Sequence, residues 1–313
     1  MEKYVILTDN CVDLYPEQRK EYGIEYPIPG VVVFPNGEEK LADVDWEQMT
    51  FEDFFHSMEK KVVYKSSMPN PYQVTERVEE YFKKGQDVLA ITLSSGMSGT
   101  YNSFLTTKKE LEAKYPERKL CVVDSHRYSG GIALLAIYAS MNRKNGMSVE
   151  DNFEWLEEKR LGLHQMGILD DLMYLSRSGR ISKFKAVMGS MVGVKPMADF
   201  DNEKGYPVVL GKSRGYKQAY KNIVAYMKAT IGDPKDKYIV ISQSIRAQQA
   251  EELKKEIEAA FAGNNITVIM NRVGQSDGVN IGPGLVAAFY LGNKTSVGCE
   301  EERKILEGIL TNK

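Results

Sequence analysis

The chain has 313 residues, of which 42% are hydrophobic and 27% are charged, a composition typical of soluble globular proteins. Its net charge of −2 argues against nucleic-acid binding, because proteins of that class usually carry a basic face. No apolar run approaches the roughly 20 residues of a membrane helix, and the short apolar start offers no signal sequence, so we expect a cytoplasmic protein without stable membrane insertion.

The first half of the sequence alternates predicted strands and helices. Apolar, β-branched runs predict the strands, and segments with helical spacing and capping residues predict the helices. This alternation predicts a parallel sheet covered on both faces, with ligands bound beyond the carboxyl ends of its strands. Strands are expected at residues 3–7, 31–34, 88–93 and 120–123, and helices at 13–21, 50–58, 71–84, 101–114 and 132–142.

The pattern changes after a linking helix expected at residues 148–160. The D-N-E-K-G turn at 201–205 predicts a hairpin and therefore antiparallel pairing. We expect an α/β domain over residues 1–160 and an α+β domain with a largely antiparallel sheet over 161–313. In the second domain, strands are expected at 162–169, 192–198, 208–210, 238–242 and 266–270, and helices at 170–176, 183–188, 216–229 and 247–260.

Two short hydroxyl clusters stand out, S-S-M-P at residues 66–69 and S-S-G-M-S-G-T at 94–100. Each falls where a strand should end and a helix begin, so its hydroxyl and backbone N–H groups can converge on a small anion. The alternative is that these serines only cap the helices that follow. The residues alone leave both interpretations open. A third segment, G-V-N-I-G-P-G at 278–284, adds backbone that a ligand can approach closely.

Other motifs exclude common kinds of site. Residues 282–287 match G-x-G-x-x-A, but they lack the N-terminal strand–turn–helix unit of a dinucleotide site; we expect Pro283 to begin a helix over 286–290. The three cysteines form no disulfide or metal spacing and are expected to be reduced. We predict neither a metal nor a cofactor. Five methionines between residues 166 and 197 either fill the core or line an adaptable apolar cavity.

Two further hypotheses concern reactive or charged side chains. Ser95 or Ser98 with His126 would make a serine-dependent hydrolase or acyltransferase, although the segment lacks the final glycine of a nucleophile elbow. Arg180 follows a glycine and can extend into a cleft between the domains toward an anion; a solvated surface arginine is the ordinary alternative.

Several motifs occur in the order found in the DegV family of bacterial fatty-acid-binding proteins, which the chain resembles over nearly its full length. The opening I-L-T-D-N-C-V-D-L at 6–14 resembles the family's strand and T-D-S-x-x-D-L. Residues 66–69 resemble T-S-Q-P, 94–101 resemble S-S-x-x-S-G-T-Y, and 278–284 resemble G-T-H-x-G-P-G. Further similar segments lie at 123–125, 175–182 and 194–196.

The resemblance implies the EDD fold and a non-enzymatic carrier of a long-chain fatty acid such as palmitate, stearate or oleate. By that resemblance the acid's carboxylate is bound by Ser66 and Ser95, with Ser67 and Ser94 as neighbours, and a separate dihydroxyacetone-kinase-like fatty-acid kinase phosphorylates the lipid. Asn280 replaces the family's histidine, and Asn280 and Arg180 are candidates for facing the cleft or a partner. A lipid-sensing regulatory protein without a kinase partner is the alternative.

Overall fold

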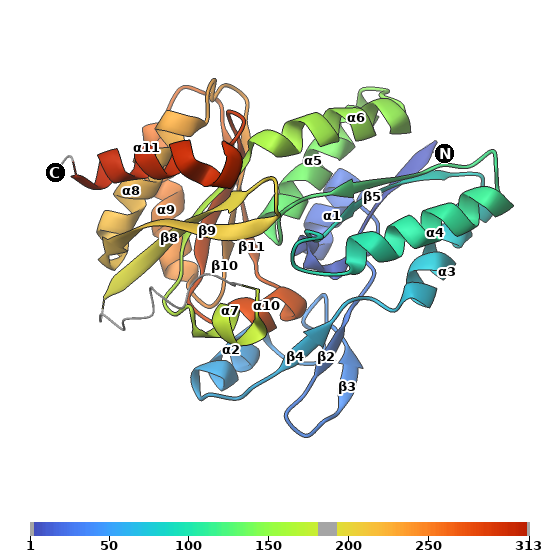
Figure 1. Ribbon diagram of the computed structural model, residues 1–313, viewed down its shortest axis with the longest axis horizontal. Helices are drawn as coiled ribbons and strands as arrows, with labels where there is room; N and C mark the ends of the chain where they lie inside the picture. Colours follow the sequence, from blue (N-terminus) through green and yellow to red (C-terminus); the bar gives the residue numbers. More distant parts are fainter. Residues whose placement is uncertain (1–2, 181–192, 312–313) are drawn as a thin grey trace.

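The computed structural model describes residues 3–180 and 193–311, which are organised around three β-sheets (Figure 1). The first sheet is parallel, in the order β1 (Tyr4–Thr8), β5 (Asp87–Thr92), β6 (Leu120–Asp124). Alternate side chains of β1 enter separate cores, because successive residues of a strand point to opposite faces. Val5 and Leu7 pack with α3 (Pro71–Lys83) and α4 (Thr100–Lys114), whereas Tyr4 and Ile6 face the core that contains α5 (Gly130–Lys144).

The second sheet has six strands in the order β11-β10-β12-β7-β8-β9 and is largely antiparallel. Only β10 and β11 pair in parallel, and the predicted hairpin joins β8 to β9. One face carries α8, α9 and α11, and α5 packs on the other (Figure 1). The strands are β7 (Leu163–Ile168), β8 (Val194–Asp201), β9 (Tyr206–Arg214), β10 (Tyr238–Gln243), β11 (Thr267–Arg272) and β12 (Val286–Leu291).

A small antiparallel sheet, β3-β2-β4, lies beside the region where the two larger sheets meet (Figure 1). It contains β2 (Val31–Val33), β3 (Glu39–Leu41) and β4 (Lys65–Ser67). Ser66 pairs with Val32, so the first serine cluster lies partly within a strand. Pro69 lies in the loop after β4, where it cannot continue the strand pairing, and Pro71 is the first residue of α3.

The remaining helices complete the layers. Thr50 is the N-cap residue of α2, and its side-chain oxygen accepts a hydrogen bond from the Asp53 backbone N–H. The other elements are η1 (Asn10–Val12), α1 (Pro16–Tyr22), α2 (Phe51–Glu59), α6 (Val149–Lys159), η2 (Arg160–Gly162), α7 (Met173–Ser178), α8 (Gly215–Thr230), α9 (Ala247–Ala260), α10 (Gln275–Ile281), η4 (Val297–Cys299) and α11 (Glu300–Thr311). No helix in the described ranges is both long and apolar enough to cross a membrane.

One predicted element is wrong: residues 286–290 form a strand and not a helix. All six residues of β12 are buried between β10 and β7, a position that suits a continuous apolar run in a sheet. The helix comes earlier, as α10. Gly282 and Gly284 then turn the chain with φ of 76° and 101°, where a side chain would collide with Tyr174 and Asp170.

The fold class predicted from the sequence is confirmed: a parallel sheet is joined to a larger, largely antiparallel one. The largest hydrophobic core draws residues from both halves, including Ile132 of α5 and Phe289 of β12. The boundary at residue 160 stays a prediction. The helix expected at 183–188 lies outside the described residues.

Candidate functional site

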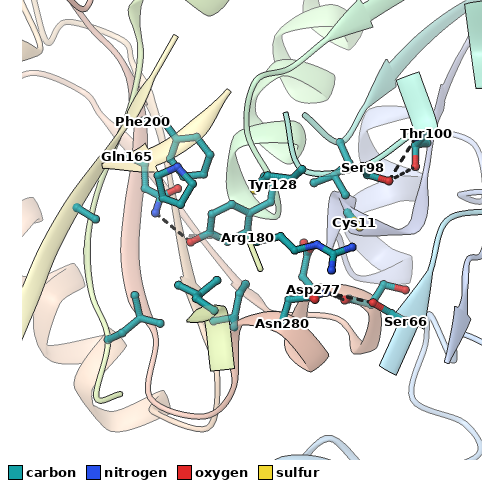
Figure 2. A pocket seen from close by; sticks show the side chains of 18 of the residues that line it. Cys11, Ser66, Ser98, Thr100, Tyr128, Gln165, Arg180, Phe200, Asp277 and Asn280 are labelled. Atoms are coloured by element: carbon teal, nitrogen blue, oxygen red, sulfur yellow. Dashed lines mark hydrogen bonds between the residues drawn. The ribbon is translucent and has the colours of Figure 1, made fainter. Parts of the chain in front are cut away.

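A cavity of about 950 Å³, including its mouth, lies where the parallel sheet, the small sheet and the β8–β9 hairpin meet (Figure 2). Hydroxyl-bearing residues gather at one side of the cavity and apolar residues line most of the rest. The lining residues are Cys11, Ser66, Ser67, Met68, Pro69, Leu93, Met97, Ser98, Thr100, Tyr128, Gln165, Leu169, Leu172, Leu175, Arg180, Pro196, Ala198, Phe200, Pro207, Val209, Ser276, Asp277, Asn280 and Ile281.

Ser66 and Asn280 form the first polar contact of the cavity wall. The Asn280 Nδ2 donates one hydrogen bond to the Ser66 Oγ at 3.1 Å and another to the Ser276 carbonyl at 2.9 Å. Both amide hydrogens are therefore used, and the Ser66 oxygen acts as an acceptor. Its own proton remains to be donated, which suits an anionic group in the cavity.

The second serine cluster contributes Ser98 and Thr100, which join through their hydroxyls at 2.9 Å. Thr100 is buried at the start of α4, and Ser98 lies in the turn that precedes it. Figure 2 shows both on the side of the cavity that carries Ser66. Hydroxyls from two distant segments thus converge on one place, as the sequence predicts.

The structure differs from the sequence-based expectation for Ser94 and Ser95. The Ser94 hydroxyl is buried and donates to the Gly205 carbonyl at 2.8 Å, which ties the turn after β5 to the β8–β9 hairpin. Ser95 is exposed, and its backbone N–H donates to Asp124 at 3.0 Å. Neither residue is part of the cavity lining. Ser98 occupies the position at the cavity wall that we expected for Ser95, because the turn points the first two serines away.

Arg180 also lines the cavity. Among the described lining residues it is the one with a cationic side chain. Its Nη1 donates to the Ser178 carbonyl at 2.6 Å, and the side chain is half-buried. In Figure 2 the guanidinium reaches toward Asp277 and the Ser66–Asn280 pair. A charged group there strengthens hydrogen bonds to an anion.

Buried acids lie beneath the polar side of the cavity. Burial, with a contribution from the charge of Asp9, raises the pKa of Asp277 to about 8. Burial also raises the pKa of Asp9 to about 6, and burial together with the Asp277 charge raises the pKa of Asp13 well above its usual value. Asp277 is therefore largely protonated at neutral pH, so it does not repel an anion in the cavity.

Cys11 lines the cavity next to these acids, and burial raises the pKa of its thiol well above the usual range. A protonated, buried thiol is a poor nucleophile. All three cysteines are free and buried. Cys11 therefore serves here as a small apolar part of the wall.

The geometry does not assemble the serine–histidine pair of a hydrolase. His126 Nε2 lies 3.2 Å from the Asp124 carboxylate, and its Nδ1 lies 2.5 Å from the Asn202 carbonyl. Both ring nitrogens face acceptors, so neither is placed to take a proton from Ser95 or Ser98. His126 instead links the two large sheets.

The methionines between residues 166 and 197 do not line the cavity where the structure describes them. Met166 and Met197 belong to the core under α8 and not to the cavity, whereas Met68 and Met97 line it. Met188 and Met191 lie outside the described residues. Among the described residues, no group of three or more His, Cys, Asp or Glu side chains is arranged to hold a metal ion.

Asp277, Tyr128 and Gln165 line the cavity but were not singled out from the sequence. Gln165 follows His164 in a strand that is buried on every residue and apolar at its other positions. A polar side chain in such a run is a usable signal, since buried polar groups need partners. Asp277 precedes the glycine-rich segment and gives no signal of its own.

Comparison with known families now identifies the class of protein. The sequence model of the DegV family, described as an uncharacterised protein family, matches residues 3–293. The chain belongs to the DegV family. Among the curated relatives, a DegV domain-containing protein of Clostridium perfringens is 31% identical over 293 residues, 94% of this chain and 99% of the relative.

Solved structures show the same fold. DegV of Bacillus subtilis, described as a fatty acid binding protein, has a TM-score of 0.75 and 25% identity, covering 94% of this chain and 100% of its own. The fatty acid kinase B3 protein of Streptococcus pneumoniae, loaded with linoleic acid, has a TM-score of 0.78 and 17% identity, covering 93% of this chain and 100% of its own.

Proposed function

We propose that this protein binds one long-chain fatty acid, with the carboxylate at Ser66 and Ser98 and the acyl tail in the apolar part of the cavity. The observation that carries the proposal is the division of one cavity into a hydroxyl-rich side and an apolar side. An unbranched acyl chain with a terminal carboxylate matches that division. The description of the B. subtilis protein as fatty acid binding, and the linoleic acid loaded in the S. pneumoniae protein, support the same ligand class.

The polar side of the cavity orients the fatty acid, because its hydrogen-bond donors bind the carboxylate. Ser66 offers a proton to the carboxylate because its oxygen already accepts from Asn280, and Ser67 lies next to it on β4. Ser98 and Arg180 add a hydroxyl and a cation from other segments. Hydrogen bonds to an ionised carboxylate are about twice as strong as neutral ones.

The apolar side supplies most of the affinity. Burying about 14 methylene groups at ~0.8 kcal/mol each gives roughly 11 kcal/mol before the costs of association. Lost translational freedom and chain ordering remove several kcal/mol of this. The remainder corresponds to a ligand that stays bound during purification.

We further propose that the protein acts as a carrier and catalyses no reaction itself. The lining holds hydroxyls, a protonated acid, a protonated thiol and an arginine, and His126 is paired with Asp124 and Asn202 and not with Ser95 or Ser98. The name of the S. pneumoniae protein supports a separate fatty-acid kinase as the partner. Asn280, in place of a histidine, makes that step the part of the proposal to test separately, since asparagine does not titrate.

The direct test is mass spectrometry of an organic extract from the purified protein. The proposal expects one fatty acid per chain. An empty extract, together with no uptake of added palmitate, stearate or oleate by the protein, would contradict it. Incubating the loaded protein with a fatty-acid kinase and ATP tests the partner: formation of acyl phosphate supports a carrier, and its absence favours a lipid sensor.

A further inference from the structure

Two polar side chains lie within the apolar part of the cavity. Gln165 comes from β7 and Tyr128 from the turn between β6 and α5, and they are 2% and 7% exposed. The Gln165 Nε2 donates to the Tyr128 hydroxyl at 2.9 Å. Figure 2 shows this pair on the far side of the cavity from Ser66 and Ser98, so it is separate from the carboxylate position.

The pair has hydrogen-bonding capacity that the described residues do not satisfy. The buried Gln165 Oε1 has no hydrogen-bond partner. The Tyr128 oxygen accepts from Gln165, and its own proton has no acceptor among the described residues. Exchanging the amide oxygen and nitrogen does not remove the mismatch, because Nε2 would then lack an acceptor.

No other described residue is hydrogen-bonded to the free Gln165 oxygen or to the Tyr128 hydroxyl. The Tyr128 ring packs on the apolar ring of Phe200, with centroids 5.7 Å apart. Buried polar groups in native proteins are normally paired, so an unpaired donor beside an unpaired acceptor requires an explanation. A saturated acyl tail offers neither a donor nor an acceptor.

A single alcohol group would satisfy both atoms. It can donate its proton to the Gln165 Oε1 and accept the proton of the Tyr128 hydroxyl. Burial raises the pKa of Tyr128, so its phenol remains a donor at all physiological pH values. We propose that Tyr128 and Gln165 form a second polar subsite, which binds a hydroxyl group on the acyl chain and makes hydroxylated long-chain fatty acids the preferred ligands.

This inference rests on the proposed function and deepens it, so the experiment must separate the two. Delipidated protein would be titrated with stearic acid and with hydroxystearic acids that carry the hydroxyl at successive chain positions. We expect stearate to bind, and at least one hydroxylated isomer to bind about tenfold more tightly, the value of one well-made buried hydrogen bond.

Two variants assign that preference to the subsite. Q165M replaces the amide by an apolar side chain of similar length, and Y128F removes only the phenol oxygen while keeping the ring. Each should reduce the ratio of stearate to hydroxystearate dissociation constants from about ten to about one. Ser98→Ala, on the other side of the cavity, should weaken both acids together and keep the ratio. Thermal melting of each variant checks folding, and either variant alone suffices for the comparison.

The outcomes are distinct. If stearate binds and no hydroxylated isomer binds more tightly, the subsite is occupied by water and the inference is wrong, while the carrier function stands. If the preference exists but survives in both Q165M and Y128F, these residues do not form the subsite. If neither class of acid binds, the proposed function itself fails.

Discussion

The side-chain amide of Asn280 donates to the Ser66 hydroxyl oxygen at 3.1 Å, and its second hydrogen goes to the Ser276 carbonyl. Helix α10 thereby fixes a hydroxyl on β4 so that its proton faces the cavity. The Ser66 hydroxyl can bind a carboxylate because it is oriented as a hydrogen-bond donor toward the cavity.

Reversing that hydrogen bond should weaken fatty-acid binding. In N280D the new carboxylate would accept the Ser66 proton and add a negative charge to the cavity wall. We expect the dissociation constant for palmitate to rise by about tenfold or more, measured by calorimetric titration. S66A should show a similar loss, whereas S66T keeps the hydroxyl and should bind within about twofold. Unchanged affinity in N280D would show that the orientation of Ser66 has no role.

Ser98 and Ser95 offer a matched pair of serines in one turn. Ser98 lines the cavity and Ser95 does not, so S98A should weaken palmitate binding by about tenfold and S95A by less than about twofold. Competition with a fluorescent fatty acid measures both variants under the same conditions. The reverse ranking would place the carboxylate at the position that the sequence resemblance implied.

The raised pKa of Asp277 predicts a dependence of stability on pH. The folded protein holds a proton up to about pH 8 that the unfolded chain loses near pH 4, so Asp277 reduces the free energy of unfolding as pH rises between these values. D277N removes the part of this dependence that Asp277 contributes, whereas the buried Asp9 and Asp13 keep their own parts. At pH 8 we expect D277N to exceed the wild type in unfolding free energy by about 1 kcal/mol or more.

Urea denaturation at pH 5 and pH 8 measures that difference, and D53N on the exposed start of α2 serves as a control without a buried acid. Ionisation of Asp277 should also weaken palmitate binding above pH 8 in the wild type. The Asp277 carboxylate then repels the carboxylate of the ligand. Parallel pH profiles for the wild type and D277N would contradict the assignment of a raised pKa to Asp277.

Asp199 should be among the residues most important for stability. Its buried carboxylate accepts from His164 at 2.9 Å and from Tyr226 at 2.9 Å, and it balances the charge of the fully buried Arg127. D199N leaves that arginine uncompensated and should lower the unfolding free energy by about 3 kcal/mol. The exposed pair of Lys84 and Glu80 is the control, and E80Q should cost less than about 1 kcal/mol. A loss below 1 kcal/mol in D199N would argue against the charge balance.

Periodicity and caps located most elements of the fold. The parallel strands and the hairpin between β8 and β9 follow from apolar runs and turn residues, which act locally. β12 was predicted as a helix because a short apolar run after a proline fits either structure. Its assignment depends on pairing with β7 and β10, which lie far away in the sequence.

The candidate site shows the same division. The sequence predicted that hydroxyls from residues 66–69 and 94–100 lie together at one sheet edge. They do line one cavity, but Ser66 and Ser67 lie within β4 of the small sheet and do not follow a strand of the parallel sheet. Which serine faces the cavity was not predictable, because it depends on the contact between Ser94 and Gly205 of the hairpin. Gln165 and Tyr128 come together only through the meeting of the two large sheets, and no local pattern encodes that contact.

The central claim is that a fatty acid occupies the cavity of this protein, and calorimetric titration of delipidated protein with palmitate tests it most directly. We predict one site per chain with a dissociation constant of about 1 µM or tighter. If one equivalent of one of these fatty acids abolishes the binding of another, both acids occupy the same cavity. No measurable uptake of palmitate, stearate or oleate would contradict the account.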